Sequence, residues 1–229
     1  MQKKRILYII GGLSRIGKTK IAEKMTERKR GFLIKLHTDR IRDSVKSIIR
    51  YGPQKTAPGD SREITFEFPT MCKQPTEKKS LTIKFTRNDG DEDAYGWLGV
   101  TNMINFYDQN NECDILVEGV AVEPKLIREL KLENLIIKGV FIGFGRDPII
   151  NESIIKSIVD YSTKEKDHFY IQHNGDSEAM KQDLENTVRS YIKNRSKFEK
   201  QVKECGCEHF DRTEHFEEDV QSVVNRLCG

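Results

Sequence analysis

The order of apolar and polar residues predicts alternating strands and helices along most of the chain. Short apolar runs rich in isoleucine, leucine and valine are typical of parallel strands buried on both faces. Four such runs occur, at residues 5–10, 31–39, 113–120 and 134–145, and we interpret the short segment CEHFD, at residues 207–211, as a fifth strand. Apolar residues with helical spacing follow them, at residues 19–30, 40–51, 94–111, 148–161, 178–204 and 215–227. Because each crossover is long enough to contain a helix, we expect one α/β domain over residues 1–229, with a parallel sheet covered on both faces.

One region, residues 52–93, breaks this alternation. It contains Pro53, Pro58, Pro69 and Pro75, and two segments within it, EITFEF and SLTIKF, alternate polar with apolar residues. This alternation is typical of strands with one face in water. We interpret the region as an inserted β-hairpin or small cap.

The first strand turns into the first helix through GLSRIGKT, residues 12–19. This fits the phosphate-binding pattern G-x-x-x-x-G-K-[ST] at every fixed position. Gly12 and Gly17 let backbone N–H groups approach a polyphosphate, Lys18 supplies charge to the β- and γ-phosphates, and the Thr19 hydroxyl is placed for Mg²⁺. We therefore expect a nucleoside triphosphate with Mg²⁺. The predicted nucleotide-binding residues are Gly12, Leu13, Ser14, Arg15, Ile16, Gly17, Lys18, Thr19 and Lys20.

Ligands of such sheets bind at the carboxyl ends of the strands, where further charged residues lie. Asp39 follows the second strand, and a carboxylate there would orient an acceptor hydroxyl and take its proton. Arg42 lies one helical turn further on, so Arg40 and Arg42 are candidates to hold an acceptor's carboxylate or phosphate. The alternative is that Asp39 caps a helix and the arginines are solvated.

Glu118 ends the third strand beside the phosphate loop. A carboxylate at this place serves Mg²⁺, here through water, or contributes to the acceptor site. The alternative is a strand-terminal acid that bonds to a neighbouring loop.

Residues 161–177 are polar and contain lysines, histidines and a glycine, so we interpret them as a mobile lid over the phosphates. An ordinary surface loop fits the same residues. Arg146, Arg189 and Arg195 are candidates to reach the transferred phosphate, and the sequence does not rank them.

The composition of the chain limits the classes of binding partner that can be expected. The 229 residues are 33% charged and carry 39 basic against 36 acidic side chains, a net charge of only +3. This balance gives no case for a nucleic-acid or membrane partner. No apolar run approaches the roughly 20 residues needed to cross a bilayer, and the basic start lacks a signal-peptide core. We expect a cytoplasmic protein.

The chain has five cysteines, which is an odd number, and we find no secretory signal in it. We therefore expect free thiols and no disulfides. Cys205 and Cys207 lie near His209 and His215, but their spacing fits no common zinc pattern. We expect no zinc.

Three segments together resemble a known family: GGLSRIGKT, HTDRIR and ILVEGVAVEP. They look like the small P-loop kinases of the nucleoside-monophosphate-kinase-like superfamily. Within these, the chain resembles the 2-phosphoglycerate kinase-like and zeta-toxin-like group, which is similar to chloramphenicol phosphotransferase. The resemblance covers about residues 5–50 and 113–145. It implies a three-layer fold with sheet order 2-3-1-4-5 and ATP-dependent phosphoryl transfer to the hydroxyl of a small acceptor. It also implies that Asp39 is the base and Arg42 holds the acceptor.

The chain departs from related kinases in ways that leave two alternatives open. The segment at 161–177 has no arginine, unlike the lid of adenylate kinases, and the N-K-x-D motif of GTPases is absent. A nucleotide-dependent switch or regulatory ATPase would use the same phosphate loop, but no sensor motif is evident. A polynucleotide end kinase would need a positive channel, against which the net charge argues. The acceptor's identity and the oligomeric state do not follow from the sequence. We expect residues 52–93 and the helix containing Trp97 to build the acceptor site.

Overall fold

A computed structural model describes residues 4–29, 33–41, 61–69, 78–86, 92–110, 113–120 and 122–229. Its main sheet has five parallel strands: β1 (Arg5–Gly12), β2 (Leu33–His37), β5 (Asp114–Glu118), β6 (Leu135–Phe144) and β7 (Glu208–Arg212). Their order across the sheet is β2-β5-β1-β6-β7. Counted along the chain, this order is 2-3-1-4-5, which confirms the expected α/β fold.

The pairing of the central strand β1 with its neighbours shows which residues lie beside the loop that follows it. Residues 7–10 of β1 are completely buried, as their apolar run predicted. Ile10 pairs with Glu118 of β5, and Gly12 pairs with Ile142 of β6. The loop after β1 and the carboxylate that ends β5 therefore lie at the same edge of the sheet.

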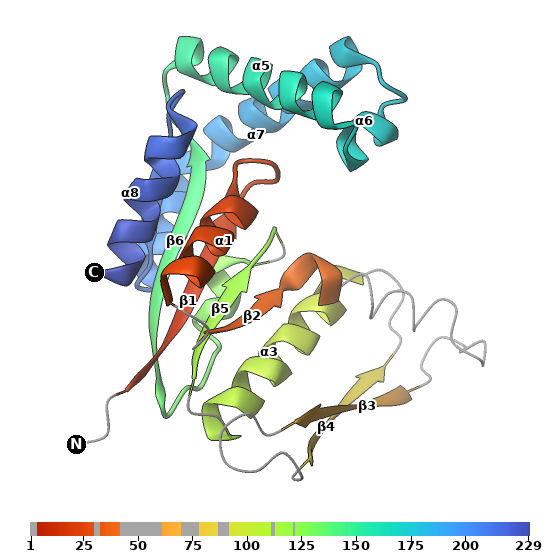
Figure 1. Cartoon of the computed structure of the whole chain (residues 1–229), viewed down its shortest axis with the longest axis vertical. Helices are drawn as coiled ribbons and strands as arrows, with labels where there is room; N and C mark the ends of the chain where they lie inside the picture. The colour runs from red at the N-terminus through yellow and green to blue at the C-terminus, as the bar shows by residue number, and fades with distance from the viewer. Residues whose placement is uncertain are drawn as a thin grey trace.

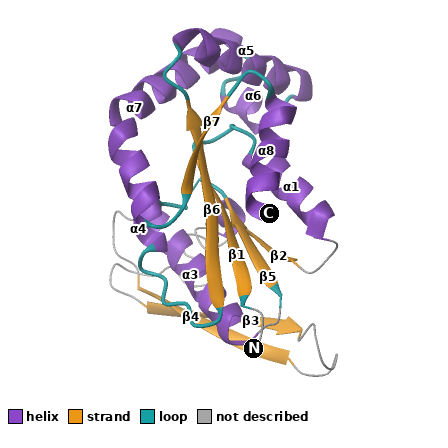
Figure 2. Cartoon of the chain, turned by 90° about the vertical axis from the view of Figure 1, so that its left-hand side faces the viewer, coloured by secondary structure: helices purple, strands orange, loops and turns teal. Residues whose placement is uncertain are grey.

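Helices cover both faces of this sheet (Figure 2). On one face Tyr8 and Ile10 pack with α1 (Lys18–Lys29), α5 (Pro148–Glu165), α8 (Phe216–Cys228) and the first half of α7 (Ser177–Glu204). On the other face Leu7 and Ile9 pack with α3 (Glu92–Asn110), α4 (Pro124–Ile127) and the end of α7. The alternation of side chains along β1 thus divides the apolar core into two layers.

The inserted region contains the expected hairpin. Strand β3 (Ser61–Pro69) pairs antiparallel with β4 (Lys78–Thr86), with Ile64 opposite Ile83. In both views this hairpin lies at the end of the molecule away from α5 and α6 (Figures 1 and 2). Trp97 of α3 is part of the core, with 6% of its surface exposed. The expectation that residues 52–93 and the helix containing Trp97 build an acceptor site stays a prediction.

Residues 161–177 are mainly helical, which differs from a loop. Helix α5 continues to Glu165, the short helix α6 spans His168–Gln172, and α7 begins at Ser177. Asp167 and Asp176 explain the difference, because each accepts two backbone N–H bonds at the start of a helix. Lys166 and Gly175 have positive φ and separate the helices. Whether this segment moves over a bound nucleotide stays a prediction.

Among the described helices, we find none that combines the length and the apolar character needed to span a membrane.

Candidate functional site

The phosphate loop has a backbone that requires its two motif glycines. Gly12 and Gly17 have φ of +113° and +98°, which L side chains rarely adopt. A Cβ on Gly12 would lie 2.0 Å from the carbonyl oxygen of Ile142, and one on Gly17 would lie 2.3 Å from the ring of Phe216. The sheet and α8 thus hold the loop so closely that any side chain at these positions would force it to shift.

Lys18 lies under this loop at the first residue of α1. It is 6% exposed, and its ammonium group donates to the carbonyl of Leu13. Burial lowers the pKa of Lys18 to about 8, although the carboxylates of Asp39 and Glu118 act to raise it. Both carboxylates therefore act on the charge of Lys18, and the ammonium still carries most of its charge at pH 7. An incoming phosphate would raise the pKa further.

Glu118 is buried at the end of β5 and faces the start of α1. Its Oε1 lies 3.4 Å from the hydroxyl oxygen of Thr19 and also contacts Nδ1 of His37. No role for His37 was predicted from the sequence. The signal was nonetheless there, because His37 ends β2 and pairs in register with Glu118 on the adjacent strand.

Asp39 lies next to the turn that follows Glu118. Residues 38–41 are helical, and Oδ1 of Asp39 accepts a 3.4 Å hydrogen bond from the hydroxyl of Thr38. A Cβ on Gly119 would lie 3.2 Å from that same Oδ1. Arg40 is exposed, and Arg42 lies outside the described residues. The structure therefore brings Asp39 to the loop of Glu118.

The oxygen atoms of Thr19 and Glu118 fit a magnesium ion that arrives with a nucleotide. Mg²⁺ prefers oxygen ligands and is usually held by one or two protein oxygens together with phosphates and water. A hydroxyl and a carboxylate at the start of α1 meet this need. Within the described ranges, no cluster of three or more His, Cys, Asp and Glu side chains is placed to hold a metal by itself.

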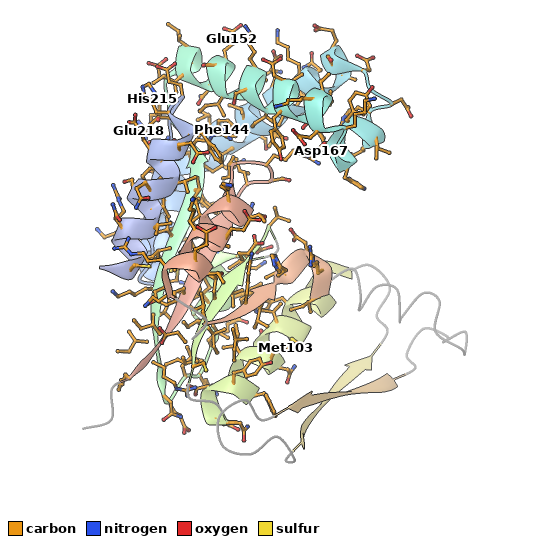
Figure 3. The ribbon with its side chains drawn as sticks, in the orientation of Figure 1. Met103, Phe144, Glu152, Asp167, His215 and Glu218 are labelled. Carbon is orange, nitrogen blue, oxygen red and sulfur yellow. The ribbon has the colours of Figure 1, made fainter. Side chains whose placement is uncertain are left out.

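Arg15 joins the phosphate loop to the segment that was predicted as a lid. Its guanidinium lies 2.9 Å from Oδ2 of Asp167 and 4.1 Å from the centre of the Phe169 ring. Figure 3 shows Asp167 where α6 begins, beside the loop. Burial alone would raise the pKa of Asp167, but the backbone N–H of Tyr170 and the charge of Arg15 lower it below its ordinary value.

Arg212, at the end of β7, contacts the phosphate loop, and this contact was not predicted from the sequence. Its guanidinium donates to the carbonyl of Arg15 at 3.3 Å and lies 4.9 Å from the centre of the Phe216 ring. Burial lowers the pKa of Arg212 to about 10, against the opposing charge of Asp219. The only hint in the sequence was a cationic residue at the end of the last strand.

The three arginines proposed to reach the phosphate have different surroundings. Arg146 and Arg189 are exposed, whereas Arg195 is 7% exposed. Arg195 bonds to Glu199 at 2.7 Å, to Asp211 at 2.8 Å and to the carbonyl of Phe144 at 2.7 Å. Figure 3 shows Phe144 at the end of β6. A phosphate contact by Arg195 would require some of these bonds to break.

A pocket of about 570 Å³ opens beside the phosphate loop. Gly12 and Leu13 form one wall, Val120 and residues 122–124 form the second, and one face of α7 forms the third. The pocket is therefore continuous with the loop that carries Lys18 and with the turn that carries Glu118.

The described cysteines are free thiols: Cys113, Cys205, Cys207 and Cys228. The fifth, Cys72, lies outside the described residues. The absence of zinc and of disulfides remains an expectation for experiment.

Comparisons with known proteins do not identify a family for this chain. No family model matches the sequence, and no curated protein matches it either. Among solved structures, the chain is similar to one from the PezAT chromosomal toxin–antitoxin system of the human pathogen Streptococcus pneumoniae. The two share 13% sequence identity, with a TM-score of 0.47, over 99% of this chain and 77% of that chain. The fold itself is established by the strand order and register of the present chain, a five-stranded parallel sheet in the order 2-3-1-4-5 with the glycine-rich loop after its central strand.

Proposed function

We propose that this protein transfers the terminal phosphoryl group of ATP, bound with Mg²⁺, to a hydroxyl group of a small molecule. The observation that carries the proposal is that two carboxylates lie at the edge of the sheet that carries the phosphate loop: Glu118 lies 3.4 Å from the hydroxyl of Thr19, and Asp39 lies beside Gly119, the residue that follows Glu118. A phosphate loop alone would serve a switch as well as a kinase. A carboxylate beside it, in the place where an acceptor hydroxyl would approach, favours transfer to that hydroxyl.

In the proposed reaction, backbone N–H groups of residues 12–19 bind the phosphates, and Lys18 balances the charge that moves toward the β–γ bridge. Asp39 orients the acceptor hydroxyl and accepts its proton as the new O–P bond forms and the bond to the β-phosphate breaks. Thr19 and Glu118 would hold Mg²⁺, which neutralises phosphate charge when it is bound. The products are ADP and a phosphate monoester.

The direct test is to incubate the protein with γ-labelled ATP, Mg²⁺ and a small-molecule cell extract. The proposal expects a new labelled small molecule and no label on added oligonucleotides. Release of labelled inorganic phosphate alone would favour a switch or regulatory ATPase. Label at oligonucleotide ends would favour a polynucleotide end kinase.

Asp39→Asn separates the base from the nucleotide site. Asparagine keeps the size and the capping ability of aspartate, so the melting temperature should change little. Turnover should fall by about a hundredfold or more, with ATP affinity retained, because the carboxylate acts on the acceptor. Affinity by calorimetry and steady-state rates provide the measurement. Loss of ATP binding would instead assign this carboxylate to Mg²⁺, and full activity would return it to helix capping.

A further inference from the structure

The position of the pocket indicates which end of a bound nucleotide it would adjoin, the nucleoside or the terminal phosphate. Lys18 serves the β- and γ-phosphates in loops of this kind, and its ammonium group lies at the carbonyl of Leu13. Leu13 also lines the pocket. The pocket therefore meets the phosphate loop on the side of the terminal phosphate, where an acceptor must enter.

The second wall places the pocket close to the proposed base. Val120 lines it and directly follows Gly119, the residue against which Oδ1 of Asp39 lies. A molecule that fills the pocket can therefore extend a hydroxyl toward the space between Lys18 and Asp39. By contrast, the described hairpin of the insert lies at the far end of the molecule (Figure 1).

The third wall is one face of α7, and its chemistry is uncharged. Asn186, Ser190 and Asn194 recur at four-residue intervals and so share a face of the helix, and Thr187 and Tyr191 lie beside them on this wall. The apolar lining residues include Val122, Pro124 and Phe198. No lysine or arginine occurs among the described residues that line the pocket.

The single charged lining residue is already partnered. Glu123 forms an ion pair with Lys125 at 2.9 Å, and both side chains are more than half exposed. By contrast, the amide of Asn194 uses only one N–H bond, to the carbonyl of Ser190. The pocket therefore offers amide and hydroxyl groups that both donate and accept hydrogen bonds, next to apolar surface, without a fixed charge for an anion.

From these features, and on the basis of the proposed kinase function, we infer that the acceptor is a hydroxyl-bearing molecule without a phosphate or carboxylate group, bound in this pocket. A phosphorylated or carboxylated acceptor is typically recognised by arginine, lysine or clustered N–H donors, and the described lining of this pocket supplies no lysine or arginine. A polyol, sugar or nucleoside instead presents the mixed donors and acceptors that the asparagine and hydroxyl side chains of α7 match.

The test divides the extract by charge before the reaction. A small-molecule extract is passed over an anion-exchange resin at neutral pH, and the flow-through and the retained fraction are each incubated with the protein and γ-labelled ATP. ATP binding and slow ATP hydrolysis are measured on the same protein without extract. We expect a labelled product from the flow-through and none from the retained fraction.

Each other outcome decides against the inference in a recognisable way. Label only from the retained fraction would overturn the neutral acceptor but leave the kinase function standing. No label from either fraction, with ATP binding intact, would overturn the pocket as an acceptor site and with it the small-molecule reaction. Failure to bind ATP would reject the proposed function at its first step.

A matched pair of variants then tests the pocket itself. Asn194→Leu removes the hydrogen-bonding group from the lining, whereas Lys193→Leu makes a similar change at an exposed neighbour outside it. We expect Asn194→Leu to raise the KM for the flow-through acceptor by about tenfold, the effect of one or two lost hydrogen bonds, with the KM for ATP unchanged. Equal acceptor KM values in the two variants would overturn the placement.

Discussion

The phosphate loop and the Arg195 cluster lie at the same edge of the sheet, but they are built in different ways. The loop is one run of eight residues, and the groups proposed to bind phosphate are its backbone N–H groups, whose path depends on Gly12 and Gly17. The Arg195 cluster consists of Tyr191, Arg195, Glu199, His209 and Asp211, and its contacts join α7 to β6 and β7. A side-chain change in the loop should therefore remove chemistry and spare the fold, whereas one in the cluster should weaken the fold and spare nucleotide binding.

Lys18→Ala is the strongest test of the first half of this comparison. We expect turnover to fall by a hundredfold or more, because the lysine acts as charge moves toward the β–γ bridge. The melting temperature should hold or rise, since a buried and desolvated ammonium group is removed. Kinetics and thermal melts measure the two effects. Lys24→Ala, a change on the exposed side of the same helix, is the control, and normal turnover in Lys18→Ala would remove the loop from the mechanism.

Arg195→Met should show the opposite pattern. The side chain is buried and its removal leaves the carbonyl of Phe144 and two carboxylates without their partner. Breaking a buried pair costs about 3–5 kcal/mol, and the partial exposure of Asp211 and Glu199 reduces our expectation to about 2 kcal/mol. Chemical denaturation gives the free energy of unfolding, with exposed Arg189→Met as the control. A stable variant that has lost activity would instead support the phosphate contact predicted from the sequence.

The same difference explains which parts of the molecule could be predicted from the sequence. The strands and the phosphate loop could be predicted because apolar runs and the spacing of glycines are patterns within a few neighbouring residues. His37 beside Glu118 was within reach, since adjacent strand ends meet once the order is known. The pairing of Arg15 with Asp167 was not, because 152 positions separate them and only the packing of α6 brings them together.

The place of the acceptor site stays a prediction. Residues 52–93 and the helix containing Trp97 were expected to build it, and much of that insert lies outside the described residues. The pocket beside the phosphate loop includes residues of α7, which the sequence showed only as a long charged helix. Only the packing of α7 near the loop brings its asparagine and serine side chains to that pocket.

Asp167→Asn tests the contact between Arg15 of the phosphate loop and Asp167, the residue that caps α6. Asparagine can still cap α6, but it loses the charge that pairs with Arg15, so we expect a loss of about 1 kcal/mol at pH 7. The pKa of Asp167 is lowered in the folded protein, so its contribution is present above the unfolded pKa near 3.8 and disappears as pH falls through the folded value. The difference in unfolding free energy between variant and parent should therefore be smaller at pH 3 than at pH 7. An equal difference at both values would contradict the charge pairing.

His209→Gln should give the smallest effect and the most specific one. His209 Nε2 lies 2.5 Å from the hydroxyl of Tyr191, and Glu199, Asp211 and Arg195 surround the ring. Burial lowers the pKa of His209, and Arg195 lowers it further, although the carboxylates of Asp211 and Glu199 oppose the shift. The unfolded chain therefore binds this proton first. Stability from His209 should fall as pH drops below about 6.5 and level off below the folded pKa.

Glutamine keeps an amide that can bond to Tyr191 but cannot titrate. We expect His209→Gln to be less stable than the parent by about half a kcal/mol at pH 7.5, with the difference shrinking toward pH 5 as the parent loses stability. Denaturation curves at pH 7.5, 6.5, 5.5 and 5 provide the measurement. Parallel pH dependences for the two proteins would mean that His209 titrates like an exposed histidine. The Arg195 cluster would then be more open to water than its buried arginine and short tyrosine contact indicate.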